Sequence, residues 1–326
     1  MSPYLRALIY SLVIITLLLT VTAWSIWFER KFSGRMQSRV GPTFYGPFGL
    51  LQPVVDGLKL LQKEFLIPES ADRALFVLAP PLTVILALGT AAVVPFGSEV
   101  VAADLDVGVL YILALGSLTT VPVWIAGWAS NNKYSLLGGM RAVAQGISYE
   151  IPLALAALVP VILAGSMSLT DIVNYQIQHG WFAFWPPGPG FFAFLFFLPA
   201  SLAEANRIPF DIPEAESELI AGVTTEYTGM GFGLLYLAEY LHTLIVSAVA
   251  SALFFGGWDG PFLPGLHWMV AKTLVLFAGI FAIRWSLVRF RSDQLMGICW
   301  RYLVPIGLGL VMVSAIWVQL AKASAQ

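Results

Sequence analysis

The chain has 326 residues, of which 58% are hydrophobic and only 11% are charged, a composition that excludes a disordered protein and an ordinary soluble domain. Its net charge of −2 excludes the basic surface that nucleic-acid binding requires, so no nucleic-acid partner is expected. Its one cysteine, Cys299, excludes an internal disulfide and an iron–sulfur cluster held by this chain alone, and no phosphate-binding or dinucleotide-binding glycine motif is present, so any redox cofactor is expected on a partner.

Long apolar runs predict an all-α integral membrane protein with eight transmembrane helices, organised as a single transmembrane helical domain over residues 1–326. Each run is expected to cross about 30 Å of hydrocarbon as a helix, because backbone groups in lipid must satisfy their own hydrogen bonds. The first run is expected to be a retained span, since charge follows it and no signal-peptide cleavage site is evident. The fifth reaches the necessary length only by continuing into the polar segment after it. The expected spans lie at about residues 4–28, 74–96, 107–129, 143–165, 190–207, 232–255, 268–288 and 302–321.

Positive charge gathers on one side of these spans. All of the 17 lysines and arginines except Arg6, Lys272 and Lys322 fall in, or at helix ends next to, the loops after the first, third, fifth and seventh spans. The positive-inside rule therefore puts those loops in the cytoplasm and both termini on the outer, periplasmic side. An amphipathic segment at about 48–66 is expected to form a cytoplasmic-side interfacial helix. It either packs beneath a soluble partner or frames a lateral opening for a lipophilic ligand.

Acidic side chains lie within the spans themselves. Glu150 is just inside the fourth span, Glu239 lies in the sixth, and Glu29 closes the first. A charged acid at membrane depth costs roughly 3 kcal/mol, so such groups usually face a bundle interior or water. With Glu204 they predict a proton or ion relay; the alternative is a set of interfacial acids that reach towards water.

The histidines give less evidence of a functional site than the acids do. The three histidines, His179, His242 and His267, are too scattered to supply paired axial haem ligands. Only His242 lies inside an apolar run. We interpret it as a packed or hydrogen-bonded helix residue.

The most polar stretch of the chain, residues 204–227, holds six acids and only one base, Arg207. We expect Asp211 to cap a new helix, with Glu214 completing a capping box. Because apolar runs flank the stretch, we expect its charge to be shared or neutralised rather than simply solvated, in part by the basic loop at 284–302. The six acids are Glu204, Asp211, Glu214, Glu216, Glu218 and Glu226.

Four long motifs resemble the family of membrane-embedded H subunits of bacterial NADH:quinone oxidoreductase, respiratory complex I. The resemblance covers essentially the whole chain, with support from LQPVVDGLKLLQKE and ADRALFVLAP. It departs from the family at Ala205, where a small hydroxyl residue is common; this removes a hydrogen bond but no titrating group. The motifs are FERK with RVGP (28–31, 39–42), GWASNNKYSLLGGMRAVAQ (127–145), EANRIPFDIPEAESELIAGVTTEY (204–227) and RSDQLMGICW (291–300).

The resemblance implies a multi-pass subunit of the bacterial inner membrane that helps to form a quinone-access chamber with two soluble subunits. NADH, FMN and the iron–sulfur clusters would be bound by partner subunits, and quinone would be the substrate. Small neighbouring membrane subunits, antiporter-like pumping subunits and membrane lipids would be further partners. No catalytic residue and no metal site are implied in this chain, which would couple quinone reduction to proton translocation electrostatically.

The resemblance also assigns roles by motif position. Proton coupling would fall to the buried acids, and the quinone chamber to residues at its mouth and on the acidic stretch. The coupling residues would be Glu150, Glu204, Glu214, Glu216, Glu226 and Glu239. The chamber residues would be Glu29, Arg30, Arg39, Arg207, Asp211 and Glu218.

Three other functions remain possible alternatives to a complex I subunit. A membrane anchor of an energy-converting hydrogenase would bind no quinone, and the full acidic loop argues against it. A self-sufficient secondary transporter would show interrupted helices in symmetric halves, and no clear internal repeat is present. A structural scaffold would tolerate neutral replacement of its acids.

Overall fold

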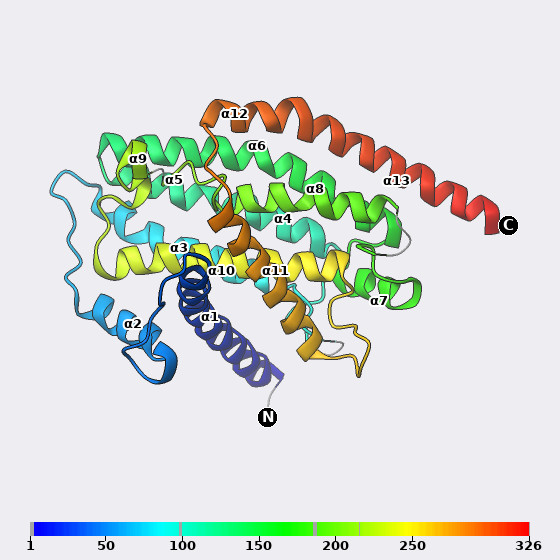
Figure 1. Ribbon diagram of the computed structural model, residues 1–326, viewed down its shortest axis with the longest axis horizontal. Coiled ribbons are helices and arrows are strands. Elements are labelled where there is room, and N and C mark those ends of the chain that lie inside the picture. Colours follow the sequence, from blue (N-terminus) through cyan, green and yellow to red (C-terminus); the bar gives the residue numbers. More distant parts are fainter. Residues whose placement is uncertain (1–2, 98–99, 185–187, 215, 326) are drawn as a thin grey trace.

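The computed structural model is a helical bundle in which most long helices follow the long axis of the molecule, whereas α1 and α11 cross it obliquely (Figure 1). Every regular element among the described residues is a helix, as the sequence predicts. Backbone is described for residues 3–97, 100–184, 188–214 and 216–325, and side chains for 11–97, 100–184, 188–214 and 218–323.

The connections between helices range from a single residue to segments of more than ten residues. Short 3₁₀ turns occur at Pro47–Gly49 and Gly222–Thr224, and a π-helical turn at Cys299–Leu303 joins the last two helices. The α-helices are α1 (Pro3–Met36), α2 (Gln52–Gln62), α3 (Arg73–Ala91), α4 (Gly108–Leu118), α5 (Thr120–Ala129), α6 (Lys133–Ala164), α7 (Leu169–His179), α8 (Pro189–Glu204), α9 (Glu216–Leu219), α10 (Gly229–Phe254), α11 (Leu266–Ser286), α12 (Ser292–Ile298) and α13 (Val304–Ala325).

Seven helical segments within the described part of the chain are long and apolar enough to cross a membrane. The fifth expected span is the exception: α8 stops at Glu204 and has 16 residues, so the predicted continuation to residue 207 is wrong. The third expected span is two helices, α4 and α5, that meet at Thr119. A helix in the amphipathic segment is confirmed as α2 but is shorter than expected, its interfacial position stays a prediction, and α7 was not predicted at all.

The fourth span begins about one-third of its length earlier than predicted. Asn132 accepts a hydrogen bond from the backbone N–H of Tyr134 and so caps α6 at the loop. The first turns of α6 contain Gly138 and Gly139, which pack tightly against neighbouring backbone, including that of Gly127 on α5. Close backbone packing, rather than apolar side chains, stabilises this end of the helix, and a hydropathy pattern does not detect it.

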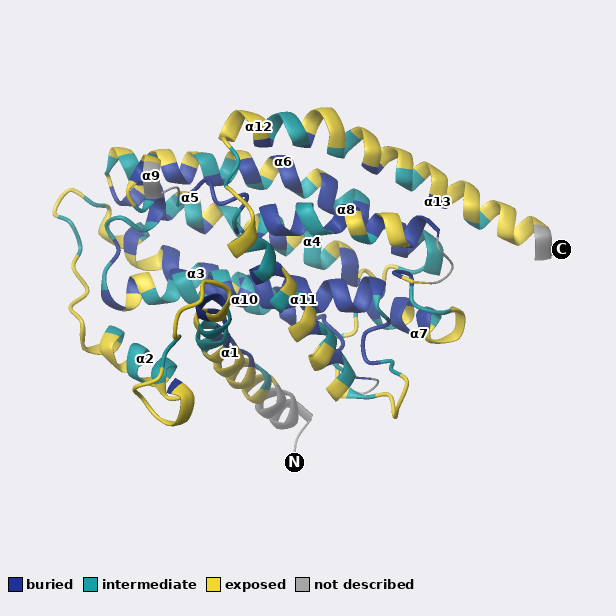
Figure 2. Cartoon of the chain, in the orientation of Figure 1, coloured by how far each residue is buried: buried dark blue, intermediate teal, exposed yellow. Residues whose placement is uncertain are grey.

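Helix α10 is the centre of the bundle. In its most apolar window 83% of the residues are buried, against 17% for the windows in α1 and in α12–α13 (Figure 2). It packs against α1, α2, α3 and α11. Polar side chains on α10 are therefore enclosed by protein on most sides.

The acidic stretch after α8 is mostly irregular. The predicted cap is wrong, because α9 begins at Glu216 and the carboxylate of Asp211 instead binds Arg289 at 3.0 Å. This ion pair confirms that the basic loop neutralises part of the stretch. Helices α2 and α9 lie towards the end of the molecule opposite the C-terminus (Figure 1).

Candidate functional site

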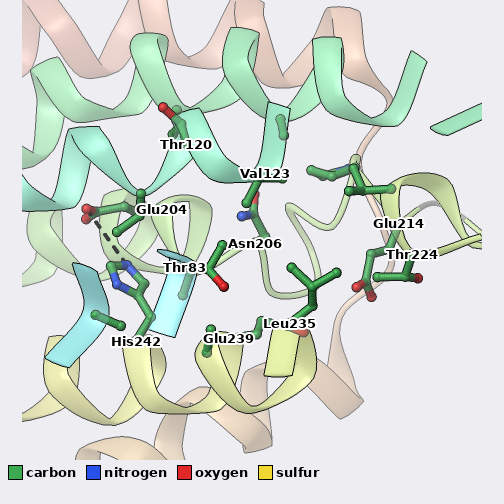
Figure 3. Close-up of a pocket in the computed structure, with 18 residues that line it drawn as sticks. Thr83, Thr120, Val123, Glu204, Asn206, Glu214, Thr224, Leu235, Glu239 and His242 are labelled. Carbon is green, nitrogen blue, oxygen red and sulfur yellow. Dashed lines mark ion pairs between the residues drawn. The ribbon is translucent and has the colours of Figure 1, made fainter. Parts of the chain in front are cut away.

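A cavity of about 110 Å³ lies inside the bundle and is lined by ionisable side chains from different elements. Glu204 comes from the end of α8, Glu214 from the loop after it, and Glu239 and His242 from one face of α10 (Figure 3). A buried water occupies about 10–15 Å³ by this measure, so the cavity has room for several waters. We call it the acid cavity.

The turn that positions Glu204 is fixed from α6. The side-chain amide of Gln145 donates to the backbone carbonyls of Ala203 and Phe210, each at 2.7 Å. These two contacts hold the end of α8 and the start of the acidic stretch against α6. Gly116 on α4 leaves the space that the carboxylate needs, because a Cβ there would lie 2.6 Å from Glu204 Oε1.

Glu204 faces His242 across the cavity wall. Glu204 Oε1 lies 3.8 Å from His242 Nε2, as the dashed line in Figure 3 marks. Neither imidazole nitrogen has a hydrogen-bond partner among the described residues, and neither has Glu204 Oε2. Of the two interpretations of His242, a packed helix residue is therefore confirmed, since only 12% of its side chain is exposed, and a hydrogen-bonded one is not.

Arg207 is the cation of the site, although only 1% of its side chain is exposed. Its Nη1 lies 3.0 Å from Glu239 Oε1, and its Nε donates to Thr243 Oγ1 at 3.3 Å. The guanidinium also lies 4.2 Å above the ring of Tyr240. A buried guanidinium requires such a carboxylate and aromatic face to replace its lost hydration.

The ion pair continues towards α1 and α11. The hydroxyl of Tyr240 donates to Glu29 Oε2, and Arg284 Nη1 binds Glu29 Oε1 at 2.6 Å. The hydroxyl of Tyr236 lies 2.9 Å from that of Tyr240. We call this series of contacts the charge ladder; it consists of Arg284, Glu29, Tyr240, Arg207 and Glu239.

Glu214 lacks a cation of its own. Burial raises its pKa to about 8, and the negative charges of Glu239 and Asp211 act in the same direction, while Arg207 opposes them. At pH 7 this carboxyl group therefore holds a proton.

A larger groove of about 450 Å³ opens between α1, α2 and α10. Most of its lining is apolar, and Arg30 and Asp56 form a 2.7 Å ion pair at it. Tyr236 also lines the groove, so its contact with Tyr240 connects the groove to the charge ladder, whose Glu239 lines the acid cavity.

The remaining predicted residues lie outside the acid cavity. Glu150 on α6 is close enough to Glu204 for the two carboxylates to repel each other. Glu226 accepts a 2.5 Å hydrogen bond from Asn132, and Glu218 forms a half-exposed ion pair with Arg141. Arg39 is exposed and bonds Gln37. Glu216 begins α9, but its side chain lies outside the described residues.

Sequence reasoning missed Tyr240, Arg284 and the partnership of His242. A signal was present on α10, where Tyr236, Glu239, Tyr240 and Thr243 recur at three- and four-residue spacing within an apolar span. That spacing puts polar groups on one helical face. It does not reveal Arg284, which meets Glu29 across 255 positions of sequence.

Fold and site together define a polytopic helical membrane protein with an ionisable interior. A family model described as NADH dehydrogenase matches residues 9–315, and the chain belongs to this family. The H subunit of NADH-quinone oxidoreductase from Dehalococcoides mccartyi strain CBDB1 is 45% identical, over 98% of this chain and 88% of its own length. Its counterpart from Thermomicrobium roseum is also 45% identical, over 94% of both chains. These matches confirm the resemblance carried by the motifs.

Proposed function

We propose that the chain is the quinone-site membrane subunit of a proton-pumping NADH-quinone oxidoreductase in the bacterial inner membrane. The family match and the names of its relatives support this assignment. The chain forms one domain of eight spans, with α8 as a short fifth span and both termini outside. NADH, FMN and the iron–sulfur clusters are bound by partner subunits, together with which this chain encloses the quinone headgroup. Small membrane subunits and lipids surround its remaining faces.

The groove between α1, α2 and α10 is the entry for quinone. An apolar lining with a few polar groups suits a headgroup attached to a long hydrocarbon tail. This assignment favours the second interpretation of the amphipathic segment, as the frame of a lateral opening. Arg30 and Glu29 lie at this entrance, and Arg39, Asp211 and Glu218 belong to the surrounding chamber.

The charge ladder carries the coupling. Reduction of a quinone to a quinol takes up two electrons and two protons, so the charge near Glu29 changes during turnover. Charges inside protein are poorly screened, so Arg207 and Glu239 experience that change, and the carboxyls of Glu214 and Glu204 then redistribute protons as a group. Glu150, Glu216 and Glu226 extend the proton path beyond the cavity.

The observation that supports this proposal best is the continuous series of contacts from Tyr236 through Tyr240 and Arg207 to Glu239, because it joins groove to cavity. Glu239→Gln keeps the shape of the side chain and removes the charge that holds Arg207. In the intact complex in vesicles we expect quinone-linked proton transfer to fall at least about tenfold. Glu69→Gln, which neutralises an exposed acid, is the matched control and should leave it unchanged. Wild-type quinone reduction and proton transfer in assembled Glu239→Gln complex would refute the coupling role.

A further inference from the structure

A second, smaller cavity of about 30 Å³ continues from the acid cavity towards α4 and α7. Its walls are almost wholly apolar and include Val109, Leu153 and Leu253. Glu204 and His242 are the two residues that line both cavities. They therefore stand where a polar space meets an apolar one.

The position of His242 suits the exchange of a proton better than simple packing. Both of its nitrogens are buried and lack a hydrogen-bond partner in the described part of the chain, which is costly unless a mobile partner satisfies them. Glu204 Oε2 is unpartnered in the same way. A side-chain movement of about 1 Å closes the 3.8 Å separation of Glu204 Oε1 and His242 Nε2 to hydrogen-bond length.

We propose that His242 is a proton-transfer residue of the coupling path, exchanging a proton with Glu204 at the junction of the two cavities; this rests on the proposed function above. The O–H bond of the Glu204 carboxyl breaks as an N–H bond forms at His242 Nε2, leaving a carboxylate and an imidazolium. The reverse step restores both neutral groups. Atoms and charge are conserved, and the only co-reactant is the proton that the acid cavity supplies or receives.

Charged groups of both signs surround His242. Glu204 on α8, Glu239 on α10 and Glu214 from the acidic stretch line the acid cavity together with it, and Arg207 is close enough to act on it electrostatically. Behind Glu204, Glu150 on α6 adds a further negative charge. Helices α3 and α4 contribute uncharged lining residues such as Thr83 and Gly116.

The test uses the intact complex in vesicles with His242→Gln, Glu204→Gln and the double variant, and measures quinone-linked proton transfer from pH 5.5 to 9. His242→Gln should slow proton transfer at least about tenfold near neutral pH. It should also change the pH profile of proton transfer, because the imidazole no longer exchanges a proton with Glu204. If the two groups act in series, the double variant should be no slower than the slower single variant.

Two further variants separate transfer from folding. Gly116→Ala leaves every titratable group in place but displaces Glu204 Oε1, which an added Cβ would approach to 2.6 Å, so it should slow transfer and keep the wild-type pH profile. Ser247→Ala, one turn along α10, removes a buried hydroxyl bonded within its own helix and should behave as wild type. If His242→Gln does not assemble, a wild-type rate in Gly116→Ala refutes the proposal.

The outcomes distinguish this inference from the function on which it rests. An assembled His242→Gln complex with the wild-type rate and pH profile, beside a Glu204→Gln complex that no longer transfers protons, overturns the role of His242 alone. Wild-type proton transfer in both variants overturns the coupling role of the acid cavity as well. A slow His242→Gln complex that keeps the wild-type pH profile shows a packing role and also refutes the inference.

Discussion

Ionisable side chains around the acid cavity differ in character because their partners differ. Glu239 is held by Arg207 at 3.0 Å, Glu204 faces an imidazole at 3.8 Å, and Glu214 has neighbouring negative charges. Burial penalises an unpaired charge far more than a paired one. The cavity therefore combines an acid that an arginine holds in place with an acid whose surroundings favour its uncharged form.

Glu214 gives this difference a measurable pH dependence. Its pKa of about 8 lies above the ordinary 4.5, so the stability it contributes is complete below about pH 4.5 and is lost as pH rises through about 8. In infrared spectra of the intact complex, a protonated-carboxyl band should disappear with a midpoint near pH 8 and be missing from Glu214→Gln. The apparent melting temperature of that variant should fall less between about pH 5 and 8 than that of the wild type. Identical titrations of the two proteins would rule out a neutral Glu214.

At this scale the sequence predicted the anions better than their cations. Glu204, Glu214 and Glu239 stand out because a carboxylate in an apolar chain needs an explanation, and all three line the acid cavity. Arg284 and Tyr240 do not stand out, because an arginine at a span end and a tyrosine within a span are ordinary features. Arg284 and Tyr240 matter because they contact Glu29, which is far from them in the chain. Contacts between distant segments leave no local pattern in a single sequence.

Helices in this bundle are positioned by small residues as much as by apolar ones. Gly127 on α5 lies so close to α6 that an added Cβ would sit 2.6 Å from the carbonyl oxygen of Ser135. Helices approach this closely only where a side chain is missing. Because α6 carries Gln145, which holds the turn after Glu204, the α5–α6 contact also supports the acid cavity.

Gly127→Ala should therefore weaken the protein through backbone displacement. Forcing a methyl group into a filled contact costs about 1–3 kcal/mol, so we expect a lower apparent melting temperature and less assembled complex on native gels. Gly279→Ala on α11 is the control: nothing lies within 4 Å of its Cβ, and alanine is the better helix former. Equal stability of the two variants would show that the close α5–α6 contact contributes nothing.

The limits of hydropathy are visible at this scale too. Long apolar runs located seven spans, because in lipid only a helix satisfies all the backbone hydrogen bonds of such a run within the run itself. They misplaced the start of α6 and the end of α8, where a cap, glycine contacts and a side-chain amide decide the boundary. The amphipathic helix α7 is too short and too polar to be detected as a span.

Across the whole molecule, the charge ladder and Tyr236 connect the groove with the acid cavity. The groove lies between α1, α2 and α10, whereas the cavity lies among α3, α5, α6 and α10. Under the proposed function, substrate access and proton redistribution are therefore separated in space but joined by direct side-chain contacts. Changes confined to the groove should accordingly alter substrate affinity and leave the proton yield per electron unchanged.

Gly57 allows this separation to be tested. It lies on α2, lines the groove, and would have no atom within 4 Å of an added Cβ, so a larger side chain can enter the groove without displacing backbone. Gly57→Trp should raise the KM for a long-tailed quinone several-fold and that for a short-tailed analogue much less, because only the tail needs the filled volume. Gly57→Ala should behave as wild type. Protons transferred per electron should not change in either variant, since the ladder begins beyond the substituted helix. An equal rise in KM for both quinones, or a lower proton yield, would show that the groove is not a separate entry for the tail.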